Sequence, residues 1–133
     1  MNNETKQFVK DWITKANEDL LVINRLTEGS VIATSAICFH CQQLVEKMLK
    51  AYLIINGKEI KKTHNIEFLL SECADFDDEF NEIDSKNLSD FGVEVRYPGD
   101  MYNPNEKEAL EYKQLAIEIK DFMTEKIEKL IKE

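Results

Sequence analysis

The fold of this chain is decided by the stretch VIATSAICFHCQQLVEKMLKAYLIIN at residues 31–56. Its apolar side chains recur every three or four positions, which is the spacing of one face of an α-helix. Further apolar residues widen that face, so we expect this helix to be the most buried of the chain. Asn56 and Gly57 close the stretch, and this pair is typical of a helix end. The rest of the chain is therefore expected to pack around this central helix.

Helical spacing also precedes this stretch. Residues 4–27 carry one apolar stripe with steps of three and four. Gly29 is expected to end that helix in a left-handed conformation, and Ser30 is placed to cap the central helix. The first two helices should thus be joined by a short turn.

Shorter helical patterns follow the central helix. A third helix is expected to start at Thr63 or Asn65, and a fourth to pass through Leu88, Phe91 and Val95. The acidic stretch between them is expected to be anchored by three apolar side chains: Phe76, Phe80 and Ile83.

The last helix is expected to run from Asn103 to about residue 131. Asn103 would be its N-cap, Pro104 its first residue, and Glu106 the partner in a capping box. The whole chain has only four Gly and two Pro, which is few for a fold of many short strands. We predict an all-α, up-and-down bundle of four or five helices in a single domain over residues 1–133.

Charge is distributed unevenly along the 133 residues. The formal net charge is −9, which argues against a protein that coats duplex DNA by neutralising its phosphates. Residues 30–64 nevertheless hold five Lys and two acidic residues, whereas residues 65–95 hold ten acidic residues and one Lys. An anion site is therefore expected near residues 30–64.

Compartment and metal content can also be judged from the sequence. No stretch reaches the roughly 18 apolar residues of a membrane span, and no secretory signal opens the chain, so we expect a cytoplasmic protein without membrane contact. Cys38, His40 and Cys41 resemble a metal motif, but on a helix His40 points away from Cys38. Three cysteines suit a reducing compartment, where we expect buried thiols and neither a metal nor a cofactor.

Polar residues along the central helix are the first candidate site. His40, Gln43, Lys47 and Lys50 are spaced as one helical face, offset from the apolar stripe. They are interpreted either as a solvated or interhelical polar face, or as the lining of an anion-accepting groove.

His64 and Arg96 extend this candidate site. His64 precedes a predicted helix start, where free amides favour an anion, although Thr63 and His64 would serve equally as caps. Arg96 precedes a turn and is suited to a bidentate contact with a phosphate or carboxylate, unless it pairs with a nearby acid such as Glu94 or Asp100.

The chain resembles the HEPN domain family, named for higher eukaryotes and prokaryotes and for nucleotide binding. The resemblance covers roughly residues 8–130. It is carried by short motifs in the central part of the chain: Phe39-His40, Gln42-Gln43, Glu46-Lys47, Leu49-Lys50-Ala51, Gly57, Thr63-His64-Asn65 and Leu69-Leu70. Matches before and after it are Trp12, Ala16, Asp19 and Leu20, and then Arg96-Tyr97-Pro98.

The resemblance implies a helical bundle that forms a homodimer, with a cleft lined by the second helix and the Arg turn. It implies a separately encoded minimal nucleotidyltransferase as partner, in a toxin–antitoxin or defence pair. Many family members are RNases whose motif is an Arg followed, after four to six intervening residues, by a His. Here Met101, Tyr102 and Asn103 occupy those positions after Arg96, so the RNase motif is incomplete. Some family partners transfer AMP to a Tyr in this region, where Tyr97 and Tyr102 lie.

We therefore expect a dimeric protein that binds a nucleotide or RNA phosphate as the partner of a nucleotidyltransferase. The predicted contacts are His40, Gln43, Lys47, Lys50, His64 and Arg96, with Tyr97 available for stacking on a base. The alternatives are an RNase toxin with an altered catalytic set, for which Arg96 and His64 are the candidates, and a non-catalytic interaction module.

Overall fold

The structure is a computed structural model that describes residues 1–92 and 103–132. Its long helices are α1 (Asn3–Leu26), α2 (Thr34–Ile55) and α4 (Glu106–Lys132), and α3 (Ile66–Ala74) is shorter. Two 3-10 helices, η1 (Asp78–Glu82) and η2 (Leu88–Phe91), lie between α3 and α4. The described residues contain no strand, so the prediction of an all-α fold is confirmed.

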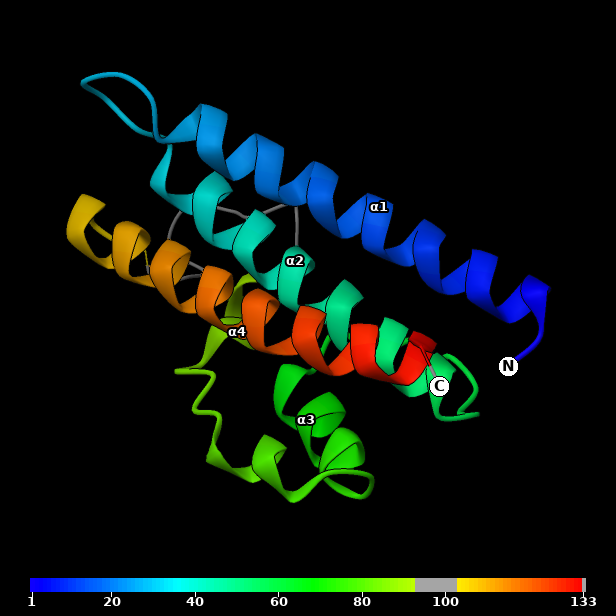
Figure 1. Ribbon diagram of the computed structural model, residues 1–133. Coiled ribbons are helices and arrows are strands. Elements are labelled where there is room, and N and C mark those ends of the chain that lie inside the picture. Colours follow the sequence, from blue (N-terminus) through cyan, green and yellow to red (C-terminus); the bar gives the residue numbers. More distant parts are fainter. Residues whose placement is uncertain (93–102, 133) are drawn as a thin grey trace.

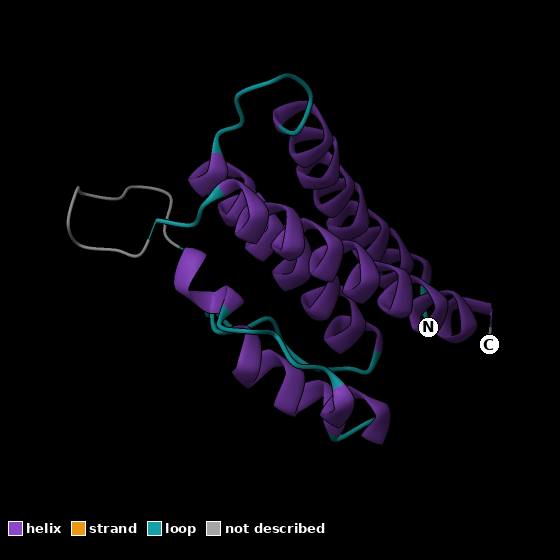
Figure 2. Cartoon of the chain, turned by 90° about the vertical axis from the view of Figure 1, so that its left-hand side faces the viewer, coloured by secondary structure: helices purple, strands orange, loops and turns teal. Residues whose placement is uncertain are grey.

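Helix α2 is the centre of the bundle. Fourteen of its residues are buried, and it packs against α1, α3, η2 and α4. Figure 1 shows α1 running antiparallel to α2, whereas α4 follows α2 in the same direction. Helix α3 and the two 3-10 helices lie between α2 and α4 in the chain, and they pack on one side of the long helices (Figures 1 and 2). Helix α4 then begins near the N-terminal end of α2 (Figure 1). The apolar stretch at residues 31–56 thus forms the core helix that its pattern predicts.

The predicted helix ends are partly correct. Gly29 and Gly57 have φ angles of +102° and +82°, so both take the left-handed conformation that glycine tolerates. Asn65 caps α3, because its Oδ1 accepts a hydrogen bond of 2.9 Å from the Phe68 amide. Ser30 does not cap α2, which begins four residues later with no side-chain cap.

Helix α4 begins later than predicted. The Glu108 amide donates to Asn105 Oδ1 at 2.8 Å, and the Asn105 amide donates to Glu108 Oε1 at 3.2 Å. This reciprocal pair is the capping box, so the assignment of Asn103 as N-cap was wrong. The reason is that two overlapping Asn-x-x-Glu patterns stand here, and the buried Pro104 precedes the helix instead of opening it.

Two further predictions between α3 and α4 need correction. Phe80 is buried and Ile83 is half-buried, but Phe76 is 42% exposed and anchors nothing. The expected fourth helix is only the short η2 in the described residues, which ends at Phe91 with Gly92 as its C-cap. Val95 lies outside the described residues. The core on this side is instead built by Phe80, whose ring lies 4.7 Å from Tyr52 and 5.2 Å from Phe122.

Candidate functional site

A network of polar side chains covers one side of α2, where α1 and the loop after α2 approach it. Its first centre is Asp19 of α1, which is 6% exposed. Asp19 Oδ2 accepts a hydrogen bond of 2.6 Å from Lys47 Nζ, and Asp19 Oδ1 lies 2.9 Å from His40 Nδ1. Because a carboxylate only accepts, His40 Nδ1 carries the proton and its Nε2 faces outward from this pair.

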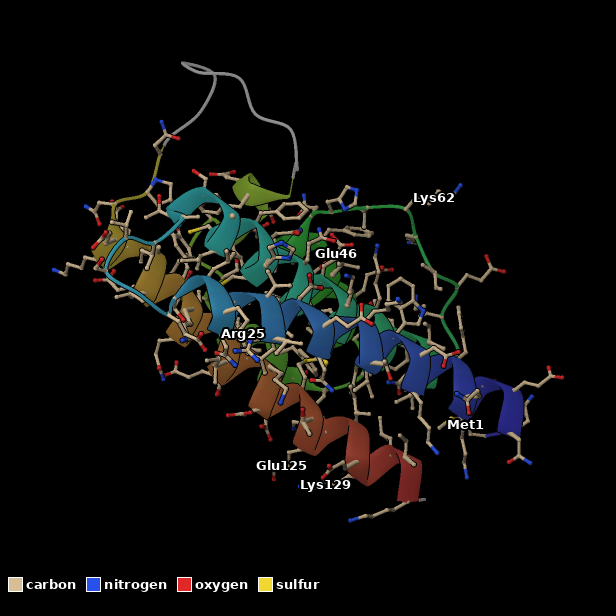
Figure 3. The ribbon with its side chains drawn as sticks, turned by 90° about the horizontal axis from the view of Figure 1, so that it is seen from above. Met1, Arg25, Glu46, Lys62, Glu125 and Lys129 are labelled. Atoms are coloured by element: carbon tan, nitrogen blue, oxygen red, sulfur yellow. The ribbon has the colours of Figure 1, made fainter. Side chains whose placement is uncertain are left out.

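The second centre is Glu46 of α2, which is 4% exposed. Its Oε1 lies 2.7 Å from His64 Nδ1 and accepts from Gln42 Nε2 at 3.1 Å, while its Oε2 accepts from Lys50 Nζ at 3.0 Å. In Figure 3 Glu46 lies between α2 and the loop that carries Lys62, whose side chain extends away from the molecule. The His64 side chain is 65% exposed, so a buried carboxylate here fixes a surface imidazole.

Two glutamines connect this network to the end of η2. Gln43 Nε2 donates to Gln42 Oε1 at 2.7 Å, and Gln42 Nε2 donates to the His64 carbonyl at 2.9 Å. A Cβ added at Gly92 would lie 3.1 Å from Gln42 Nε2 and 3.2 Å from the His64 Cβ. Gly92 thus allows the chain to pass closely over the site, four residues before Arg96.

Most of the lysines that made residues 30–64 positive are paired with carboxylates in the folded chain. Lys47 pairs with Asp19 and Lys50 with Glu46, while Lys58 and Lys61 lie 3.9 and 3.0 Å from Glu72. The local positive charge predicted from the sequence is therefore largely compensated. The chemistry of the site lies in the two carboxylate-bound imidazoles instead of in unpaired ammonium groups.

Two backbone amides at the start of α3 already donate to side chains of this protein. The Ile66 amide donates to Ser89 Oγ at 2.7 Å and the Phe68 amide donates to Asn65 Oδ1. Asn65 is therefore the cap of α3, and the interpretation of Thr63 and His64 as its caps was wrong: Thr63 Oγ1 accepts from the Asn65 amide, and the His64 ring is bound to Glu46. His64 contributes through its ring and not through the helix end.

The structure brings together five of the predicted site residues and leaves two outside its description. His40, Gln43, Lys47, Lys50 and His64 share this network, but Lys50 is 6% exposed and its ammonium is held in the interior by Glu46. Lys50 also lies 5.9 Å from the centroid of the Trp12 ring. Arg96 and Tyr97, like Tyr102, lie outside the described residues.

Cys38, His40 and Cys41 do not form a common site. Both cysteines are fully buried, and burial raises the pKa of the Cys41 thiol far above its usual range. His40 is turned to Asp19 instead. A thiol that stays protonated is a poor metal ligand. In the described part of the chain, no three His, Cys, Asp or Glu side chains gather as a metal-binding group.

The two carboxylates at the centre of the site were not assigned a role from the sequence. Asp19 lies 21 residues before His40, and Glu46 lies 18 residues before His64. The signal that would have found them is their position, since each acidic residue stands on the otherwise apolar face of its helix. A buried acid needs a partner, and the only two histidines of the chain were available.

The comparisons with known proteins agree with the all-α fold. A sequence profile of the HEPN domain matches residues 9–127. The chain belongs to the HEPN domain family. A crystal structure of an archaeal HEPN homologue, ST0689, is similar to this HEPN domain with a TM-score of 0.63 and 28% sequence identity. That similarity covers 90% of this chain and 97% of the homologue.

The comparison with curated proteins finds no significant match. HEPN domains commonly dimerise. None of the helices within residues 1–92 and 103–132 has the length and apolar character needed to cross a bilayer. The matched region includes α1 from residue 9 onward, all of α2 and the site between them, so the residues of the polar network lie within the part of the chain that matches the family.

Proposed function

We propose that this HEPN domain binds the phosphate of a nucleotide or of RNA at the outer side of α2. The observation that carries the proposal is the pair of imidazoles, each bound through Nδ1 to a buried carboxylate. Within the described residues no hydrogen bond reaches the Nε2 of His40 or His64. An imidazole held in this way presents Nε2 as a hydrogen-bond donor to phosphate when protonated, and as an acceptor when neutral.

Exposure and charge support a phosphate ligand at this place. The side chains of His64, His40 and Lys47 are 65%, 27% and 23% exposed, so all three are accessible from solvent. The two lysines and two carboxylates of the network balance each other, so the imidazoles are the groups left to meet a phosphate as hydrogen-bond partners.

Arg96 is the expected further contact. The chain passes Gly92 in contact range of Gln42 and His64, and Arg96 follows four residues later. A guanidinium binds a phosphate with two parallel hydrogen bonds, which an imidazole does not provide. We propose that Arg96 and the imidazoles act on the same ligand, with Gln43 positioning Gln42 and Tyr97 available to a base.

The test is equilibrium binding of ATP, GTP and a short single-stranded RNA to the purified protein. His64→Gln and Arg96→Ala are each expected to weaken binding by about tenfold or more, since a charge-assisted hydrogen bond contributes roughly 1.5–3 kcal/mol. Lys129→Ala removes an exposed cation from the last turn of α4 and is expected to leave binding unchanged. Equal affinity in all four proteins, or no binding below millimolar ligand, would remove the proposal.

We propose that this domain is a cytoplasmic homodimer. Its proposed partner is a minimal nucleotidyltransferase, with which it would form a toxin–antitoxin or related defence pair. This part rests on membership of the HEPN family alone. It is tested by the neighbouring reading frame and by copurification of its product with this chain. A neighbouring gene of another class, or a nucleotidyltransferase that does not copurify, would remove the partner.

An RNase with an altered catalytic set is the second candidate, and one observation favours it. His64 bound to the buried Glu46 has the arrangement of a general base oriented by a carboxylate. In that reaction His64 Nε2 takes the proton of a 2′-OH, the 2′-oxygen bonds to phosphorus, and the 5′-oxygen leaves with a proton from a second acid. Incubation of metal-free protein with RNA tests it. Intact RNA after hours would exclude it, and His64→Gln must abolish any cleavage.

A further inference from the structure

A hollow with aromatic walls lies on α1 directly beside the proposed phosphate site. It has a volume of about 290 Å³ and is lined by Phe8, Asp11, Trp12 and Lys15 of α1 together with Lys47 of α2. Lys47 belongs to both places, because its ammonium is bound to Asp19 while its side chain borders the hollow. Asp19 in turn holds His40 at 2.9 Å. Two side chains therefore separate the hollow from an imidazole of the site.

The hollow has two aromatic walls, the exposed ring of Phe8 and the half-buried ring of Trp12. Phe8 is 45% exposed, and its ring packs edge-on against Trp12 with 6.3 Å between centroids and 70° between planes. A single exposed apolar residue needs no explanation, but here two aromatic rings are joined in one depression. Small-molecule sites are typically concave and apolar, with a few polar groups at defined positions.

Trp12 has one polar atom that the fold leaves unused. Its indole Nε1 is buried and has no hydrogen-bond partner within the described residues. A buried Trp N–H usually finds a partner. A small rotation of this ring toward a ligand acceptor would therefore break no existing hydrogen bond.

We propose that this hollow is the nucleobase subsite of the phosphate site, an inference that rests on the proposed function. The base would stack on the Phe8 ring and meet Trp12 edge-on, because the two ring planes lie 70° apart, with the phosphate directed past Lys47 to His40. Aromatic walls favour a flat, unpaired base, because every base has a π-face and stacking needs no particular sequence.

The same chemistry is carried by a mononucleotide and by single-stranded RNA. Duplex RNA does not fit, since its bases are stacked within the helix. A second copy of the chain covering the hollow is a different occupant and is treated as an outcome of the test.

Trp12 makes the subsite directly measurable, because it is the only tryptophan of the chain. Its fluorescence is recorded during titration with adenosine, AMP, ribose 5-phosphate and a short unpaired RNA. Adenosine, AMP and RNA are expected to change the emission, and ribose 5-phosphate is not. A stronger response to RNA than to AMP at equal nucleotide concentration assigns the site to RNA, and the reverse assigns it to mononucleotides.

Phe8→Ala is expected to weaken AMP and RNA binding by about tenfold, because stacking on one aromatic ring has roughly that effect. Phe8→Leu keeps the apolar volume and tests the aromatic ring separately if the first variant is unstable. The matched control is Phe76→Ala, which removes a similarly exposed ring at 42% and borders no part of this hollow. The control is expected to bind like the unchanged protein.

Failure of the subsite is distinguishable from failure of the phosphate site. If ribose 5-phosphate competes with fluorescent RNA but adenosine leaves Trp12 unchanged, the subsite is overturned and the proposed function stands. If adenosine changes the emission in the His64→Gln variant as in the unchanged protein, the subsite is supported independently of that imidazole. If Phe8→Ala shifts the protein from dimer to monomer without any nucleoside response, a second copy occupies the hollow and the inference is wrong.

Discussion

Replacement of Glu46 by Gln tests whether the buried carboxylate of Glu46 holds the polar network together. Glu46 is 4% exposed and accepts hydrogen bonds from Lys50, His64 and Gln42. Glu46→Gln keeps the size of the side chain but removes its charge. The ammonium of Lys50, whose side chain is 7% exposed, then stays buried without a counter-charge. Breaking a buried ion pair on one side typically costs about 3–5 kcal/mol.

We expect the lower end of that range, about 3 kcal/mol, because the amide oxygen of Gln still accepts one hydrogen bond from Lys50. The free energy of unfolding is measured by urea titration with circular dichroism as the signal, under two-state conditions. The double variant Glu46→Leu with Lys50→Met removes both charges and is expected to recover most of the loss, since apolar replacement of a buried pair is often neutral.

Lys129→Ala supplies the exposed control for this measurement. Lys129 and Glu125 form a pair of 3.5 Å whose side chains are 71% and 72% exposed. Such a pair contributes about 0–1 kcal/mol, so the free energy of unfolding of this variant should be close to that of the unchanged protein. If the free energy of unfolding of Glu46→Gln lies within about 1 kcal/mol of that of the unchanged protein, the assignment of Glu46 as the buried centre of the site is refuted.

Three further outcomes are expected. Asn105→Ala should lower the free energy of unfolding by about 1 kcal/mol because it removes the cap of α4, whereas Asn103→Ala should not; equal effects in thermal melts would reverse the assignment. Gly92→Ala should destabilise the fold by about 1–3 kcal/mol and weaken ligand binding, because its Cβ would crowd Gln42 and the His64 Cβ; unchanged stability and affinity would show that the chain need not pass closely there. The hydrogen bond from Lys126 holds the pKa of Asp77 below its usual value, so this pair stabilises the fold above the unfolded pKa of about 3.9 and is lost as the pH falls through the lower folded pKa. Asp77→Asn should therefore be less stable than the unchanged protein at pH 7, by roughly 0.5–1 kcal/mol, and the difference should shrink as the pH falls below the unfolded pKa; a difference in urea titrations that does not shrink with falling pH would contradict the ion pair as its cause.

The helices could be predicted because their signals are local. The apolar spacing of residues 31–56 defines α2, and Gly57 ends it with a left-handed φ whatever surrounds it. Errors arose where two local signals competed. Asn103 and Asn105 both stand three residues before a Glu, and in the structure, where Pro104 is buried, Asn105 and Glu108 form the capping box.

The site was predicted only in its outline. Helical spacing placed His40, Gln43 and Lys47 on one side of α2, and the structure confirms that they lie there. The spacing also suggested that Lys50 faces an anion, whereas Lys50 is buried against Glu46. The difference between a surface cation and an interior ion pair depends on how closely α1 and the following loop cover α2.

The sequence by itself determined an all-α chain of the HEPN family, with its most buried helix at the centre and polar residues along one side of that helix. Only the tertiary structure decided which charges face each other. Asp19 meets His40 and Lys47 across two helices, and Glu46 meets His64 across a loop. The reason is physical: secondary structure follows from neighbours in the chain, but the charge of a site is the sum over groups that folding brings within hydrogen-bond distance. That sum turned a positive stretch of sequence into a balanced network with two imidazoles at its surface.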